Sequence, residues 1–182
     1  MWLQDRKEKI RKLTLCAMFL AASVIISAVE GISGVNAFIP LPGVRLGFCN
    51  IATAACLYLV SATGALAISV IRPLFMFMIS GNPVSFAMSL FGSVVSCLSL
   101  IATKKLYGNL FTCAGVSCIS AVFHSIGQIA AAMIIMGDNA LLWYLPLLLA
   151  ASSVAGSVSG CVMNLILPVI GKTLHGKAGI KT

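Results

Sequence analysis

Long apolar stretches separated by short polar or glycine- and proline-rich segments dominate this chain. Six such stretches occur, at about residues 13–29, 46–60, 65–80, 84–103, 114–136 and 141–170. Their lengths are close to the roughly 20 residues that a helix needs to cross about 30 Å of hydrocarbon. The pattern therefore predicts an all-α integral membrane protein, built as a bundle of six transmembrane helices.

Turn signals mark the boundaries between the predicted helices. Residues 30–45 are too rich in glycine and proline for a helix, and they are long for a connection inside a bundle. Shorter turns are predicted at residues 61–64, 81–83 and 137–139, and Pro146 predicts an irregular start of the last helix. No internal repeat or linker is visible, so residues 1–182 are expected to form a single membrane domain.

Composition strengthens the membrane assignment. The chain is 60% hydrophobic and only 9% charged, whereas a soluble domain is about half apolar and about a quarter charged. The net charge of +8 does not indicate nucleic acid, because the basic residues form short clusters rather than a face interleaved with aromatics. Membrane lipid is the expected surrounding of this surface.

The positions of lysine and arginine predict the orientation. Ten of the twelve fall in segments that lie on one side if the N-terminus is inside: Arg6, Lys7, Lys9, Arg11, Lys12, Lys104, Lys105, Lys172, Lys177 and Lys181. Basic residues in short loops favour the cytoplasmic side. We therefore expect a multi-pass protein of the cell membrane with both termini in the cytoplasm. The basic and then apolar N-terminus resembles a signal peptide, but a weak cleavage context favours a retained first helix.

The reactive residue types are sparse. Seven cysteines lie mostly within apolar runs, without a CxxC pair, and are expected to be small buried hydrophobes rather than metal ligands. Only four acidic residues are present, and they are scattered, so an aspartate-rich Mg²⁺ site is excluded. No Walker A motif or nucleophile–base set is evident. The sequence predicts a chain that is not an enzyme and that holds no metal or cofactor.

Placing a polar or charged side chain in the hydrocarbon core costs free energy, so such residues usually have a functional or structural role. Arg72 stands beside Pro73 in an otherwise apolar run. It either binds an anion in the bundle interior, or reaches the outer headgroups or pairs with Glu30 to fix the fold. His124 and Gln128 are four residues apart and share one helix face, near Ser117 and Ser120. That face either contacts a ligand or makes hydrogen bonds between helices.

These and other polar residues converge on the outer half of the predicted bundle. The expected substrate-binding set is Glu30, Asn36, Arg45, Asn50, Arg72, Asn82, His124 and Gln128. Two arginines make a ligand with a carboxylate, phosphate or polarised carbonyl plausible. The asparagines at helix ends are also ordinary turn residues.

Small residues predict close helix contacts. Gly156 and Gly160 have GxxxG spacing, for which packing inside the bundle is expected. Ala17 and Ala21 form a small-residue stripe on the first helix. That stripe is either internal packing or a docking interface for another membrane protein.

Several runs resemble a known family. They are PLPGVRLGFCN at residues 40–50, IRPL at 71–74, GNP at 81–83, GVSCISAVFHSIGQ at 115–128 and YLP at 144–146. They are similar to the Gx transporter family, whose members are often labelled heptaprenyl diphosphate synthase component I. That family more distantly resembles the substrate-binding S components of energy-coupling-factor transporters.

The resemblance implies a function. S components have six helices with both ends inside, bind substrate under a long loop, and dock through helix 1 on a transmembrane coupling protein with ATPase subunits. The expectation is therefore a substrate-binding subunit for uptake of a small vitamin-type or other metabolite. The alternative is a non-catalytic membrane subunit associated with prenyl diphosphate or quinone synthesis, and a ligand-free scaffold is a third reading.

Overall fold

A computed structural model describes residues 2–32, 47–104 and 113–175, and within these ranges all regular structure is helical. The elements are α1 (Trp2–Ile32), α3 (Asn50–Leu59), α4 (Ala62–Ser80), α5 (Pro83–Lys104), α6 (Cys113–Met136), the 3-10 helix η1 (Asn139–Tyr144) and α7 (Leu145–His175). The prediction of an all-α chain is confirmed. The predicted outer loop at residues 30–45 lies almost entirely outside the described residues.

Five of the described helices, α1, α4, α5, α6 and α7, are long and apolar enough to cross a membrane. The sixth, α3, has ten residues and is about 15 Å long at 1.5 Å per residue. That is half of a hydrocarbon core, so the predicted count of six spans is not confirmed.

The first helix is longer than the predicted range 13–29. It begins at Trp2 because its polar start also consists of good helix formers. Glu8 and Lys12 form an i,i+4 ion pair of 2.8 Å on its exposed surface. The polar segment therefore extends the apolar helix by about two to three turns.

The predicted turns at residues 61–64, 81–83 and 137–139 coincide with helix ends. Ser61 caps α4 by accepting a hydrogen bond of 3.0 Å from the Gly64 amide. Gly81 ends α4 with φ +63°, a left-handed conformation that favours glycine. Gly137 has φ +66°, and Asp138 then accepts from the Ala140 amide at 2.8 Å. The irregular start predicted near Pro146 is η1, which precedes α7.

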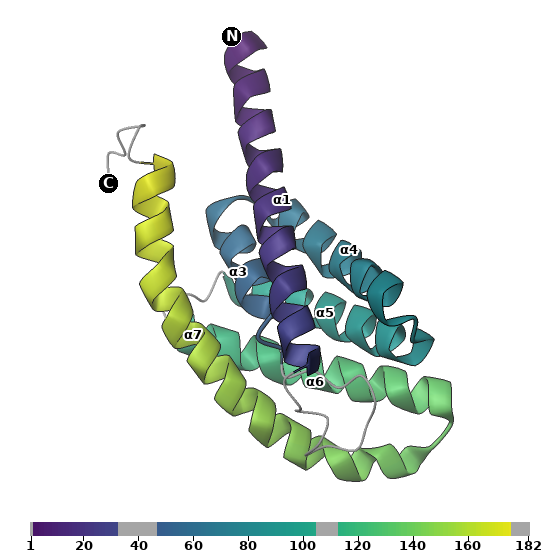
Figure 1. Cartoon of the computed structure of the whole chain (residues 1–182). Coiled ribbons are helices and arrows are strands. Elements are labelled where there is room, and N and C mark those ends of the chain that lie inside the picture. Colours follow the sequence, from purple (N-terminus) through teal and green to yellow (C-terminus); the bar gives the residue numbers. More distant parts are fainter. Residues whose placement is uncertain (1, 33–46, 105–112, 176–182) are drawn as a thin grey trace.

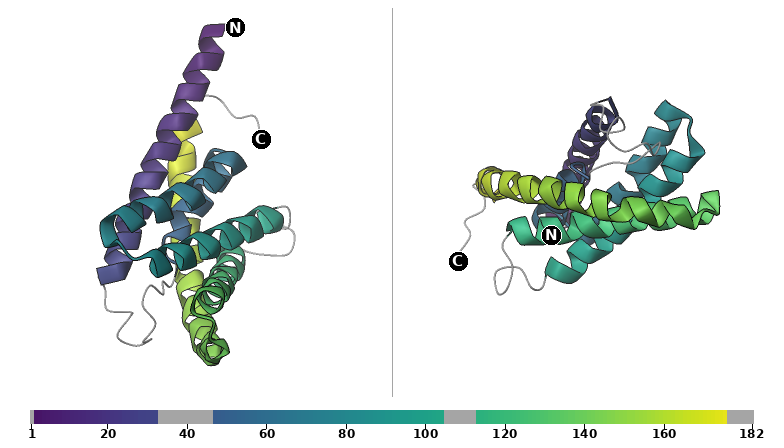
Figure 2. Two further views of the ribbon diagram at one scale, coloured as in Figure 1. Left: turned by 90° about the vertical axis from the view of Figure 1, so that its right-hand side faces the viewer. Right: turned by 90° about the horizontal axis from the view of Figure 1, so that it is seen from below.

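The helices do not share one direction. Figure 1 shows α1 and the C-terminal part of α7 running upright, while α4, α5 and α6 run across them, and both views in Figure 2 agree. The N-terminal part of α7 lies alongside α6 before the helix curves away. The arrangement is therefore less parallel than the simple bundle that the sequence suggests.

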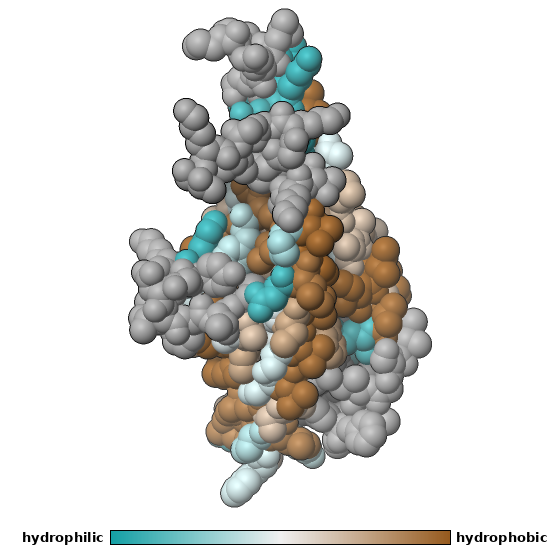
Figure 3. Space-filling view, turned by 90° about the vertical axis from the view of Figure 1, so that its left-hand side faces the viewer, coloured by the Kyte–Doolittle hydropathy of each residue, from teal (hydrophilic) through white to brown (hydrophobic). Residues whose placement is uncertain are grey.

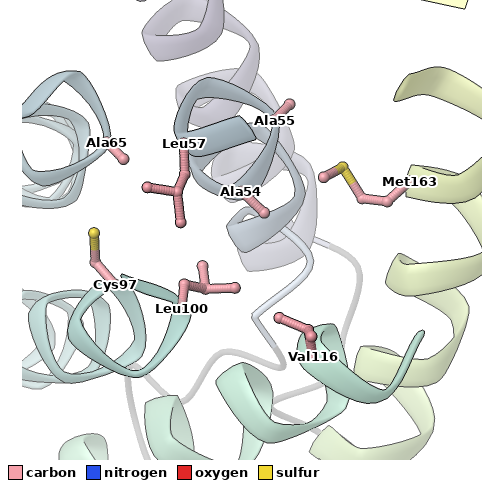
Figure 4. Packing of buried hydrophobic residues seen from close by; sticks show 8 residues of the cluster. All are labelled: Ala54, Ala55, Leu57, Ala65, Cys97, Leu100, Val116 and Met163. Atoms are coloured by element: carbon pink, nitrogen blue, oxygen red, sulfur yellow. The ribbon is translucent and has the colours of Figure 1, made fainter. Parts of the chain in front are cut away.

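The short helix α3 lies at the centre of the fold and contacts all five long helices. Seven of its ten residues are buried. Figure 4 shows its alanines and Leu57 surrounded by side chains of the other helices, and the cluster consists of Ala54, Ala55, Leu57, Ala65, Cys97, Leu100, Val116 and Met163. Alanine permits this convergence because its side chain keeps backbones close together.

The outside of the fold is largely apolar. Exposed side chains include Met78 at 78%, Trp143 at 86% and Leu165 at 73%. Hydrophobic residues dominate much of the visible face in Figure 3, and hydrophilic ones gather where the N-terminal part of α1 lies. So much exposed apolar surface is expected of a chain surrounded by lipid rather than water.

The contact between α1 and α3 yields a direct test of the fold. The sulfur atoms of Cys16 and Cys56 are 3.7 Å apart, so a membrane-permeant thiol oxidant should join them after small side-chain rotations. We expect peptide mapping under non-reducing conditions to recover a Cys16–Cys56 cross-link. Cys16→Ser should abolish it, whereas Cys161→Ser should not, because Cys161 is exposed on α7. Its absence after complete oxidation of the wild-type thiols would contradict this packing of α1 on α3.

Candidate functional site

Gly47, just before α3, is the meeting point of several predicted site residues. Its backbone amide donates a 2.8 Å hydrogen bond to Oε1 of Glu30 near the end of α1. Its φ of +89° lies in the left-handed region, which favours glycine. Glu30 thus connects the end of α1 to the start of α3 and is buried there, with 7% of its surface exposed.

Asn50 and His124 both lie close to this glycine. A β-carbon added to Gly47 would be 3.1 Å from Nδ2 of Asn50 and 3.5 Å from Cδ2 of His124. Both side chains are buried, with 8% of Asn50 and none of His124 exposed. The absence of a side chain at position 47 is therefore what lets α3 approach the polar face of α6.

His124 and Gln128 form the predicted pair on one face of α6. Nε2 of Gln128 and Nε2 of His124 are 3.0 Å apart, and both side chains are fully buried. With the amide nitrogen as donor, the histidine Nε2 accepts and Nδ1 carries the proton of a neutral ring. This contact lies within α6, so it holds the imidazole in one orientation toward Gly47.

The α5 helix packs against this pair at a second glycine, Gly92. A β-carbon on Gly92 would meet Cγ of Gln128 at 2.8 Å and the carbonyl oxygen of His124 at 2.9 Å. One turn along, Oγ of Ser96 and Oγ of Ser120 are 2.6 Å apart, which links α5 to α6 by a buried hydrogen bond. The backbones of α5 and α6 are consequently in close contact beside the histidine.

A cavity opens next to this cluster, where α3, α5, α6 and α7 meet. It encloses about 230 Å³, including its open side, and is lined by Gly47, Asn50, Ile51, Ala54, Leu100, Ser117, Ser120, Ala121, Gly156 and Ser159. The space inside it that a water-sized sphere can occupy is only about 10 Å³, roughly what one water molecule needs. In this conformation it is a narrow cleft between apolar walls and hydroxyl groups, and a metabolite would enter it only if the surrounding helices moved apart.

Two polar atoms of the lining make this cavity chemically notable. Nδ2 of Asn50 and Oγ of Ser159 are buried and have no hydrogen-bond partner within the described chain. Buried polar groups are normally satisfied, so each such atom needs an explanation. A ligand in the cavity could satisfy a donor on α3 and a hydroxyl on α7 at once.

The predicted site residues separate into groups. Glu30, Asn50 and His124 lie at Gly47, and Gln128 joins them through its contact with His124. Asn82 does not join them: its side-chain oxygen caps α5 by accepting from the amides of Val84 at 3.0 Å and Ser85 at 3.2 Å. That position is about 15 Å along α5 from Gly92. Asn36 and Arg45 lie outside the described residues.

Arg72 and the alanine stripe (Ala17 and Ala21) lie away from the cluster at Gly47 and from the cavity. Arg72 is fully buried on α4, a helix without residues in the cavity lining. Ala17 and Ala21 are both exposed on α1, whereas Gly156 is buried, and a β-carbon there would be 2.7 Å from Cα of Cys118 on α6. The predicted internal packing is confirmed for Gly156.

Sequence reasoning missed Gly47, Gly92 and Ser159 as parts of this site. Glycines inside or just before apolar helices signal close backbone approach in general. The chain has 16 glycines, and spacing alone did not tell which of them lie against the histidine. Ser159 lies next to the GxxxG glycine at position 160, and its position on α7 directs its hydroxyl into the cavity.

Within the described residues, no group of three or more histidine, cysteine, aspartate or glutamate side chains could hold a metal ion. The groups that gather near Gly47 are an amide pair, an imidazole, a carboxylate and hydroxyls. They can donate and accept hydrogen bonds to a bound molecule. The prediction that the chain is not an enzyme stays a prediction.

Fold and site together define the class: a multi-pass, all-helical membrane protein with a small polar-lined cavity between its helices. The family follows from comparison. A family model described as heptaprenyl diphosphate synthase component I matches residues 19–166, so the chain belongs to that family. No curated protein and no solved structure matches the chain. The family predicted from the sequence runs is therefore confirmed, whereas the likeness to S components stays a prediction.

The contact of Gly92 with α6 can be tested by adding one methyl group. Gly92→Ala should lower the free energy of unfolding by about 1–3 kcal/mol, because overpacking displaces the backbone or Gln128. Gly31→Ala is the matched control, since a β-carbon there meets nothing within 4 Å. It should be neutral or slightly stabilising. Thermal unfolding in detergent measures both, and equal stability of the two variants would contradict the close approach of α5 and α6.

Proposed function

We propose that this protein is the substrate-binding membrane subunit of an uptake system for a small vitamin-type or other metabolite. The observation that supports it best is the cavity beside the His124–Gln128 pair, whose lining includes buried polar atoms without partners at Asn50 and Ser159. Buried polar atoms without partners need an explanation, and these two face the same cavity. A ligand that hydrogen-bonds to both would explain them.

The proposal includes a partner that supplies energy. We propose that a separate transmembrane coupling protein with ATPase subunits drives transport, since the sequence holds no Walker A motif. Ala17 and Ala21 are exposed on α1, and only 17% of the apolar window of this helix is buried, against 50% for α6. An exposed stripe of small residues on a peripheral helix supports docking of α1 on another membrane helix.

A second candidate function is favoured by the family description. A non-catalytic membrane subunit that works beside a prenyl diphosphate synthase would fit the word "component". The two candidates predict different partners when the tagged protein is purified from its native membrane. A coupling protein with ATPases supports uptake, whereas a prenyltransferase in the absence of such a complex contradicts it.

Substitutions at the cavity test the ligand directly. We propose to identify by mass spectrometry the small molecule that co-purifies with the wild-type protein, and then to measure its dissociation constant. Loss of one hydrogen bond should weaken binding about five- to tenfold in Asn50→Ala and in Ser159→Ala. The matched controls are Asn139→Ala and Ser157→Ala, both at exposed positions. Unchanged affinity in both cavity variants would place the ligand elsewhere.

The proposed topology has six crossings, both termini in the cytoplasm and a location in the cell membrane. Its support is the distribution of basic residues, ten of twelve on one side. In a bacterial host, a green fluorescent protein fused to either end should fluoresce, and alkaline phosphatase fused to either end should be inactive. Opposite signals at the two ends would require an odd number of crossings and contradict the topology.

A further inference from the structure

Arg72 is the largest fully buried side chain of the described residues. Its guanidinium nitrogens, Nε, Nη1 and Nη2, all lack a hydrogen-bond partner within the described chain. The sequence offered Glu30 as an ion-pair partner, but the Glu30 carboxylate accepts from Gly47 instead. The structural alternative of a Glu30–Arg72 pair is therefore wrong for the described conformation.

Contacts between α4 and α5 fix the level at which Arg72 lies. Pro73 has no amide hydrogen, so the carbonyl of Ser69, four residues earlier, is left without its helical donor. Oγ of Ser93 on α5 donates to that carbonyl at 2.6 Å. Further along, the rings of Phe77 and Phe86 have centroids 5.2 Å apart.

These two contacts bracket Arg72 in an antiparallel pair of helices. They bring it level with Leu90 and Phe91 on α5. On the same stretch of α5, Gly92 contacts Gln128 and His124. Arg72 thus lies at the level of the polar cluster, with α5 between them.

A buried cation without a partner is strongly unfavourable, because its desolvation is not compensated by charge or hydrogen bonds. The arginine side chain presents a planar set of donors that matches the oxygens of phosphate or carboxylate. The Arg72 side chain therefore has the chemistry to bind an oxyanion.

We propose that Arg72 binds an oxyanion, a phosphate or a carboxylate, that forms part of the transported substrate. This inference rests on the proposed function and narrows its substrate class to anions. The substrate stabilises the fold because it compensates a charge that is otherwise buried alone.

The test uses the full-length protein in phosphatidylcholine nanodiscs. Thermal unfolding is followed with phosphate, pyrophosphate and acetate as separate probes, each against chloride at the same ionic strength. We expect at least one oxyanion to raise the unfolding temperature of the wild type by several degrees. Arg72→Gln should lose the response, whereas Arg11→Gln, at an exposed position on α1, should keep it.

The unfolding temperature of the Arg72 variants without anion shows whether Arg72 binds an anion or only stabilises the fold. Because Arg72→Gln removes an uncompensated charge, its unfolding temperature without anion should equal or exceed that of the wild type. Arg72→Lys, which retains charge but not the planar fork, should bind the responding oxyanion at least tenfold more weakly. A lower anion-free stability of Arg72→Gln with an unchanged anion response overturns the proposal, as does the absence of any response in the wild type.

Two further experiments are needed. One distinguishes a soluble anion from a lipid headgroup, and the other distinguishes failure of this inference from failure of the proposed function. A gain in phosphatidylglycerol discs that needs Arg72 and no soluble anion assigns the site to a lipid headgroup and overturns the substrate assignment. If the co-purified ligand depends on Asn50 and Ser159 but not on Arg72, the uptake proposal stands and this inference fails. If it depends on none of the three residues, both fail.

Discussion

The fold depends on how closely five long helices can approach one short helix. In lipid, apolar side chains gain little by leaving one apolar surrounding for another, so helices associate mainly through close van der Waals contact and hydrogen bonds. The α3 helix meets this condition with alanines at its centre, and it contacts every long helix. Ala54 belongs both to this contact region and to the lining of the cavity. The same small side chain therefore sets the helix spacing and the width of the site.

Glycines extend this principle to the polar cluster. Gly47 brings Asn50 beside His124, and Gly92 brings α5 against Gln128. The backbones of neighbouring helices consequently lie close to the buried polar groups. The shape of the site therefore depends in part on positions that carry no functional group. The guanidinium of Arg72, on the other side of α5, contrasts with this neutral cluster.

Much of the architecture was predictable, because apolar length and turn residues act locally. Helix ends at Gly81 and Asp138 follow from backbone conformation and capping. The length of α1 was underestimated because its first residues are polar yet still good helix formers. The length of α3 was overestimated because an apolar run does not show where the chain leaves the helix.

The site was only partly predictable, since it depends on contacts between helices. The 3.6-residue period placed His124 and Gln128 on one face. It could not show that Gly92 covers the pair, or that Ser159 reaches the cavity from α7. Those facts depend on the angles at which helices cross, and these angles result from packing of the whole chain. Asn36 and Arg45, outside the described residues, are still predictions.

The hydrogen bond from Ser93 to the Ser69 carbonyl has a consequence for the history of the sequence. The hydroxyl at position 93 serves a carbonyl that only a proline at position 73 leaves open. A lineage that replaced Pro73 by a residue with an amide hydrogen would restore the helical bond and release position 93 from selection for a hydroxyl. Substitutions at these two positions, twenty residues apart in the chain, should therefore tend to occur together over evolutionary time.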